Sequence, residues 1–150
     1  MAETVSNSLS DELYQLVQKE RFVLLGTIDH ETQAPSISAI SWVFAPDPGT
    51  IRFAVDKHSR IVANIQNNSK VVLNLIGADS TYSINGTARI ASERMEDVPL
   101  KLAMIEIAIE SVRDVMFYGS RISVEPQYEK TYDKNAAAKL DQQVMSALRK

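Results

Sequence analysis

The chain has 150 residues, of which 45% are hydrophobic and 23% are charged, values that fit one globular domain over residues 1–150 and exclude a disordered, collagen-like or coiled-coil chain. Because it contains no cysteine, disulfides, thiol nucleophiles and cysteine-bound metals are excluded. The net charge of −3 argues against a nucleic-acid partner held through its phosphates.

The N-terminal region predicts an amphipathic helix over residues 10–19. Leu9, Leu13, Leu16 and Val17 recur on one helical face, and either Ser8 or Ser10 can cap its start. The region lacks the basic and apolar segments of a signal peptide, and no apolar run in the chain approaches the ~20 residues of a membrane helix. We therefore expect a cytoplasmic protein without membrane contact.

Three strands are predicted in the next part of the chain. Residues 22–29 (FVLLGTID) are apolar on both faces, as in a strand that is covered on both sides. Residues 36–44 (SISAISWVF) alternate and predict one continuous strand, and Pro46-Asp47-Pro48-Gly49 predicts a turn. Residues 50–55 predict a third strand with Ile51, Phe53 and Val55 directed inward.

A short helix is predicted at residues 59–66, followed by strands at 71–76 and 82–91. Gly86 lies inside the alternating pattern of residues 82–91, and the pattern continues unbroken on both sides of it. The glycine therefore indicates a bulge or a close backbone approach more than a hairpin turn. Residues 100–117 fit either a strand or a helix, and the alternating isoleucines favour a strand; residues 135–149 predict a helix. The result is a mainly β domain of six or seven antiparallel strands with two flanking helices, arranged as a closed or split barrel.

The most informative polar cluster is Asp56-Lys57-His58-Ser59-Arg60, which follows a strand and opens a helix. Ser59 can cap that helix, and first-turn N–H groups together with an arginine fork make a suitable anion site. The alternative is a solvated helix cap with surface charges, and spacing alone favours it. A cation at a helix start opposes the helix dipole unless something negative binds beside it, so Arg60 favours the anion.

The remaining candidates are few. Trp42 fits a core or interface anchor better than a ligand-stacking residue, although the small residues Ser38, Ala39 and Ser41 leave a low sheet surface where a flat ligand could lie. His30 is interpreted as a solvated turn residue. Hydrolase, zinc-protease, nucleotide-binding and dinucleotide-binding motifs are absent, so no catalytic residue and no metal site is predicted.

The order FVLLGTID, Ala34-Pro35, SISAISWVF, IRFAVDKHSRIVANIQNNSKVVLNLIG and YSINGTARIASE resembles the pyridoxamine 5′-phosphate oxidase-like superfamily of FMN-binding split β-barrels. The most specific part is the Ser-Arg pair followed by Asn64-Ile65 and Asn68. The resemblance implies that Ser59 and Arg60 hold the FMN phosphate. It also implies that Ala39, Ile40 and Ser41 present backbone groups to the flavin ring, and that Ala54 and Val55 line the ribityl chain.

The resemblance further implies a homodimer with flavin in the subunit interface and an FMN-dependent oxidoreductase acting on a small-molecule substrate or electron donor. Pyridoxamine phosphate oxidases carry an arginine- and histidine-bearing C-terminal segment, whereas this chain ends QQVMSALRK, so that particular substrate is not implied. The alternatives are a non-catalytic flavin-binding or stress-response module, a haem or F420 binder on the same barrel, and a barrel that serves only as an interaction protein.

Overall fold

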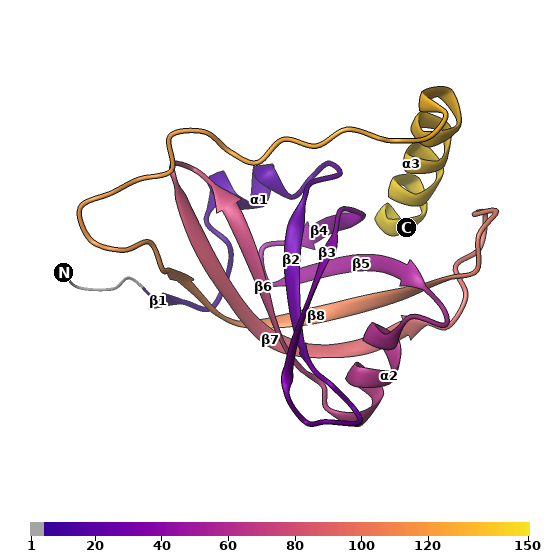
Figure 1. Ribbon diagram of the computed structural model, residues 1–150, viewed down its shortest axis with the longest axis horizontal. Helices are drawn as coiled ribbons and strands as arrows, with labels where there is room; N and C mark the ends of the chain where they lie inside the picture. Colours follow the sequence, from indigo (N-terminus) through magenta and orange to yellow (C-terminus); the bar gives the residue numbers. More distant parts are fainter. Residues whose placement is uncertain (1–4) are drawn as a thin grey trace.

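The computed structural model describes residues 5–150, so residues 1–4 of the expected domain lie outside the described part. An antiparallel sheet curls around a central core and carries three helices at its margins (Figure 1). The elements in chain order are β1 (Val5–Ser6), α1 (Asp11–Leu16), β2 (Val23–Ile28), β3 (Pro35–Ile40), β4 (Val43–Asp47), β5 (Thr50–Asp56), α2 (Arg60–Asn67), β6 (Lys70–Gly77), β7 (Ser80–Ser92), β8 (Leu102–Asp114) and α3 (Lys134–Arg149).

The strand order is β3-β2-β6-β7-β8-β5-β4, with the short β1 added to β8, and every pairing is antiparallel. The two ends of this order, β3 and β4, follow each other directly in the chain. The chain therefore passes from one edge of the sheet to the other without a long connection. This arrangement is the split β-barrel expected from the sequence, although the two-residue β1 was not expected.

The prediction of one continuous strand over residues 36–44 is wrong. The strand is interrupted at Ser41 and Trp42, so that β3 pairs with β2 while β4 pairs with β5. Alternation of apolar residues persists through the interruption, although β3 has no buried residue and β4 is largely buried, and periodicity alone does not reveal a change of partner. The predicted turn at residues 46–49 is also shorter than expected, since β4 extends to Asp47.

The other predicted elements are confirmed with small shifts at their ends. α1 is capped by the side chain of Ser10, which accepts a hydrogen bond from the Leu13 amide at 3.2 Å. Residues 102–114 form a strand, as the alternating isoleucines favoured. Gly86 lies at a register shift between β7 and β8, and an added Cβ would come within 2.4 Å of the Ala108 carbonyl oxygen. The residue is therefore required for a close backbone approach.

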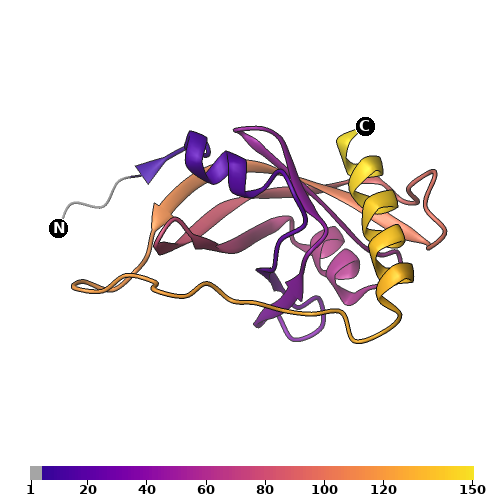
Figure 2. The ribbon, with the colours of Figure 1, turned by 90° about the horizontal axis from the view of Figure 1, so that it is seen from above.

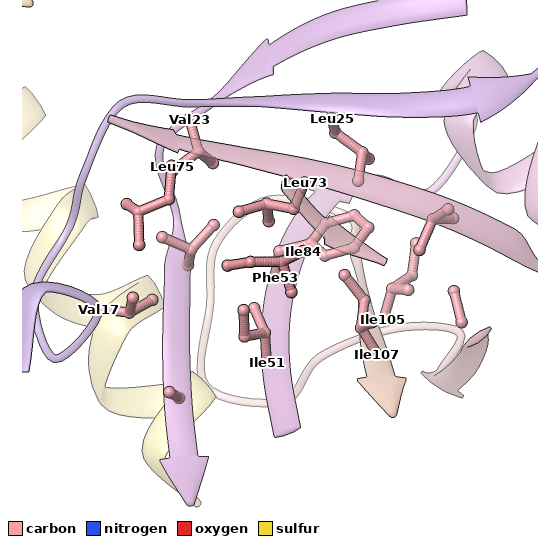
Figure 3. Close-up of a cluster of buried hydrophobic side chains, with 14 of the residues drawn as sticks. Val17, Val23, Leu25, Ile51, Phe53, Leu73, Leu75, Ile84, Ile105 and Ile107 are labelled. Carbon is pink, nitrogen blue, oxygen red and sulfur yellow. The ribbon is translucent and has the colours of Figure 1, made fainter. Parts of the chain in front are cut away.

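The main core fills the inside of the curled sheet (Figure 3). Ile51 and Phe53 of β5 are fully buried, as predicted, and face Ile84, Ile105 and other aliphatic side chains from the neighbouring strands. Each such side chain contributes about 1.5–3 kcal/mol when it is removed from water. This core fixes the position of β5, which forms one wall of the site described below, and of β2, which pairs with the strand β3 of the other wall.

A second, smaller core lies beneath α3. Val144 and Leu148 of this helix are fully buried and pack with Phe44 and Leu102 from the sheet. The connection that brings the chain to α3, residues 115–133, has no helix or strand and crosses the molecule as an extended segment (Figures 1 and 2). We call residues 115–133 the C-terminal strap. Among the helices of residues 5–150, none is long and apolar enough to cross a membrane.

Candidate functional site

A pocket of about 430 Å³ opens where the sheet is split, and we call it the split pocket. One wall is the end of β3 with the two residues that follow, and the other is the end of β5 with the start of α2. Its volume lies within the range typical of small-molecule sites. The lining residues are Ser38, Ala39, Ile40, Ser41, Trp42, Ala54, Val55, Asp56, Ser59 and Ile61.

The interruption of the strand at Ser41 and Trp42 creates the opening. The Ser41 carbonyl accepts hydrogen bonds from the amides of Arg21 and Val43, both at 3.0 Å, while the Trp42 carbonyl accepts one from the Ala54 amide at 3.1 Å. The Ser41 carbonyl therefore bonds toward the β2–β3 side of the sheet, and the Trp42 carbonyl bonds to β5 on the other side. The divergence leaves a hollow that small side chains do not fill.

The lining combines small, apolar and polar side chains. Ser38 and Ala39 on β3 are small and keep the backbone accessible. Ile40, Val55 and Ile61 supply apolar surface. Trp42 adds an aromatic wall, and Asp56 is the one charged residue of the lining. Such a surface suits a flat, largely uncharged ring system with polar edges.

The start of α2 reaches the pocket through Ser59. Its hydroxyl oxygen accepts a hydrogen bond from the Ile61 amide at 3.1 Å, which confirms the predicted N-cap. Buried Asn64 fastens the helix to the end of β2, since its amide group donates to the Thr27 hydroxyl at 2.9 Å and its oxygen accepts from the His30 amide at 2.9 Å. The helix start is consequently held at a fixed position beside the pocket.

His30 is not the solvated turn residue that the sequence indicated. Its ring Nδ1 lies 2.8 Å from Asn64 Oδ1, and its side chain is only 31% exposed. No pattern in the sequence indicated this contact, because Asn64 lies 34 residues further along the chain and the residues around His30 are polar, as in a solvated turn. His30 therefore belongs to the structure that supports α2.

Arg60 does not line the split pocket. Its guanidinium forms a two-point ion pair with Asp29, with Nε at 2.7 Å from Oδ1 and Nη2 at 3.1 Å from Oδ2, and it also contacts Glu31 at 3.0 Å. Its hydrogen bond to Asp29 raises the pKa of Arg60, and the same contact, aided by the amides of Thr32 and Glu31, lowers the pKa of Asp29 far below its ordinary value. The negative group that the cation at the helix start requires is thus supplied by the protein itself.

The predicted site residues are therefore brought together with one exception. Ala39, Ile40, Ser41, Ala54, Val55 and Ser59 all line the split pocket, whereas Arg60 lies beside it on the Asp29 carboxylate. Sequence reasoning missed Asp29 as a partner of Arg60, since a carboxylate in a turn after a strand has no distinctive signal. The prediction that Trp42 is an anchor agrees with its packing against the second core, and the structure shows that Trp42 also lines the pocket.

A larger hollow of about 640 Å³ lies elsewhere, between the β6–β7 turn and the first part of the C-terminal strap. It is lined by Asp79, Tyr82 and Asp114 with the exposed side chains of Phe117 and Tyr118. It contains none of the predicted site residues and no helix terminus. We place the candidate site in the smaller split pocket, where polar and apolar groups converge.

Solved structures of other proteins share the fold at low sequence identity. A Lactobacillus delbrueckii protein assigned to the pyridoxamine 5′-phosphate oxidases is 20% identical over 75% of this chain and 98% of its own, with a TM-score of 0.61. General stress protein 26 of Bacillus anthracis is 15% identical over 71% and 94%, with a TM-score of 0.57. HutZ, a haem storage protein of Vibrio cholerae, is 11% identical over 68% and 90%, with a TM-score of 0.51.

A search of curated proteins found no match to this chain. The family model described as pyridoxamine 5′-phosphate oxidase matches residues 9–116, which include all strands from β2 to β8 and the whole split pocket. The strap beyond residue 116 and α3 lie outside that match. This chain is accordingly a member of the pyridoxamine 5′-phosphate oxidase family.

Proposed function

We propose that this protein binds FMN in the split pocket and acts as a flavin-dependent oxidoreductase on a small molecule. The observation that carries the proposal is the convergence, in one pocket at the split of a family barrel, of Ser38 to Trp42, Ala54 to Asp56 and the capped start of α2. A flavin supplies the hydride chemistry when it is bound, and the protein supplies orientation and polar contacts.

The flat part of the ligand matches the β3 side of the pocket. Ala39 and Ser41 have side chains too short to cover the strand, so their backbone groups are within reach of a ring edge. Ile40 and Val55 provide the apolar surface that a ring face requires. Asp56 is the one ionisable side chain of the lining, and no contact identifies it as an acid or a base in a reaction. We therefore name no catalytic residue.

The phosphate matches the α2 side of the pocket. The Ser59 hydroxyl lies in the lining and can donate its proton to a phosphate while its oxygen accepts from the Ile61 amide, and the positive end of the α2 dipole favours an anion there. The Arg60 side chain is 53% exposed, so it can turn toward a phosphate placed near Ser59 once its ion pairs with Asp29 and Glu31 break. In the proposed complex, Arg60 exchanges Asp29 for the phosphate dianion.

We also propose that the functional unit is a homodimer. On the outer face of the sheet Leu24, Ile28 and Val72 are only half-buried by this chain, and Ile37 is 70% exposed beside them. Ala39 belongs to the same face and also lines the split pocket. A second copy that covers this face would therefore adjoin the flavin site.

A cysteine-free chain suits a reducing compartment, and the cytoplasm is the location that we propose.

The second candidate is a flavin-binding module without turnover. It is supported by the same pocket, whose lining offers Asp56 as its single ionisable side chain. Haem binding has the support of a shared fold with HutZ, but the lining of the split pocket contains no histidine, the commonest axial ligand of haem. An F420 ligand would use the same ring wall.

The visible spectrum of the purified protein, before and after addition of FMN, separates these candidates. Two flavin bands that stay with the protein on gel filtration support FMN binding, and a Soret band supports haem. Protein that retains neither added FMN nor riboflavin contradicts the proposal. Reduction of the bound flavin by NADH or NADPH in a stopped-flow instrument then favours the oxidoreductase over the module without turnover.

A further inference from the structure

The C-terminal strap beyond residue 116 and α3, which lie outside the family match at residues 9–116, are tied to the rim of the split pocket. The indole Nε1 of Trp42 donates a hydrogen bond to Asp141 Oδ1 of α3 at 2.8 Å. These residues are 99 positions apart in the chain. The contact joins a residue of the pocket lining directly to a helix outside the family match.

A lysine of the strap completes the connection. Lys130 Nζ lies 2.7 Å from Glu20 Oε2 and 3.2 Å from Asp141 Oδ1. The side chains of the three residues are only 26%, 20% and 16% exposed, whereas the strap around Lys130 is mostly exposed. Although burial lowers the pKa of Lys130, its hydrogen bonds to the two carboxylates raise it overall, so the ammonium group persists as the link.

Glu20 extends the same network to a second residue of the rim. The Ser41 hydroxyl donates to Glu20 Oε2 at 3.1 Å. The hydroxyl proton of Ser41 and the indole proton of Trp42 are thereby both committed to carboxylates outside the pocket. On this side of the pocket the Ser41 oxygen remains available only as an acceptor.

We propose that Asp141 and Lys130 are positioning residues that hold Trp42 and Ser41 at the rim of the split pocket, so that α3 and the strap form part of the ligand site. Without the link, the indole would be free to leave its position between the pocket and the second core. The rim would then lose both its aromatic wall and the fixed orientation of its hydroxyl acceptor. The effect on ligands rests on the proposed function, whereas the placement of Trp42 can be tested without any ligand.

Trp42 is the only tryptophan in the chain, so its fluorescence reports on this site alone. In the ligand-free protein we expect Asp141→Ala to shift the emission to longer wavelength and to increase quenching by acrylamide. Asp141→Asn should remain close to the wild type, because an amide oxygen still accepts from the indole. The matched control is Asp97→Ala, which removes another carboxylate bonded to the α3 region, through Lys150 at 2.9 Å, away from the split pocket.

An emission spectrum of Asp141→Ala identical to that of the wild type overturns the proposal, as does an equal shift in Asp97→Ala. Far-UV circular dichroism establishes that each variant is folded. If Asp141→Ala does not fold, Lys130→Met takes its place, since it removes only the cation that joins the two carboxylates. Lys130→Met should give a smaller shift in the same direction, and no shift contradicts the link.

The ligand part of the proposal is tested by titrating FMN and riboflavin into the same variants. Loss of a positioned aromatic wall should weaken both ligands alike, by about three- to tenfold in Asp141→Ala. Unchanged affinities together with a shifted emission would show that Trp42 moves without consequence and would overturn the ligand role. If the wild type binds neither flavin, the proposed function fails, and the ligand-free spectra still decide the placement of Trp42.

Discussion

Arg60 and Asp29 form a two-point ion pair across 31 residues of sequence, with contacts of 2.7 and 3.1 Å between paired nitrogens and oxygens. Arg60 is the first residue of α2, and the pair holds its guanidinium against a carboxylate of the β2–β3 turn, beside the split pocket. Any phosphate bound near Ser59 must compete with Asp29 for this guanidinium. The competition leads directly to the first two predictions.

Arg60→Ala should weaken FMN binding far more than riboflavin binding. Charge-assisted hydrogen bonds to a phosphate contribute roughly 1.5–3 kcal/mol each, so the FMN dissociation constant should rise by about one to two orders of magnitude. Ser59→Ala should act in the same direction with a smaller effect, and Lys57→Ala is the control. Titration by flavin fluorescence measures all three, and equal losses for both flavins would mean that the phosphate site is misplaced.

Asp29→Asn should strengthen FMN binding relative to riboflavin. The change removes the carboxylate charge that competes for Arg60, and partly exposed ion pairs of this kind are modest, so the gain should be about two- to fivefold. The asparagine oxygen can still accept hydrogen bonds from the amides of the turn. An FMN affinity that falls together with the riboflavin affinity would indicate damage to the turn and would contradict the competition.

The stability contributed by Asp29 should depend on pH in a defined window. Because Arg60 and the turn amides lower its pKa in the folded state, the ionised carboxylate stabilises the fold at pH values above its unfolded pKa. This contribution is lost as the pH falls toward the lower pKa of the folded state. The difference in Tm between wild type and Asp29→Asn should therefore be constant near neutral pH and shrink below about pH 4. A difference that stays constant in acid would contradict the ion pair.

Gly86→Ala should destabilise the barrel. The added Cβ would lie 2.4 Å from the Ala108 carbonyl oxygen and 2.6 Å from a methyl group of Ile107, so β7 and β8 must separate locally. We expect a loss of about 1–3 kcal/mol in the free energy of unfolding, typical of overpacked sites. Chemical denaturation measures the change. Gly49→Ala is the control, because its Cβ would approach nothing closer than 3.4 Å.

Ile37→Asp should dissociate the proposed dimer. Ile37 is 70% exposed on the outer face of β3, and a carboxylate there would be buried without a partner when a second copy covers this face. Sedimentation should show a dimer for the wild type and a monomer for the variant at micromolar concentration. Leu100→Asp, which changes an exposed residue of the β7–β8 loop, should remain dimeric. A wild type that sediments as a folded monomer would contradict the dimer itself.

The elements whose residues lie close together in sequence were predicted from the sequence. Alternation placed Ile51, Phe53 and Val55 inward, serine preceded α2 as its cap, and Gly86 marked a close approach, because each depends on a local periodicity or a local backbone requirement. The six predicted site residues that line the pocket were grouped by the family resemblance and not by these patterns. A single face of a strand or helix is encoded by the residues of that strand or helix alone.

Tertiary structure decided the features that depend on which distant residues meet. The interruption at Ser41 and Trp42 arises because the two halves of an alternating segment pair with different strands. An alternating pattern shows which residues share a face of a strand, but it does not show which strand is the partner. The sequence placed Arg60 at a helix start but left its counter-ion open, and only the fold brings it to Asp29. Likewise Trp42 meets Asp141 across 99 residues, since such long-range contacts are set by packing and leave no local signal.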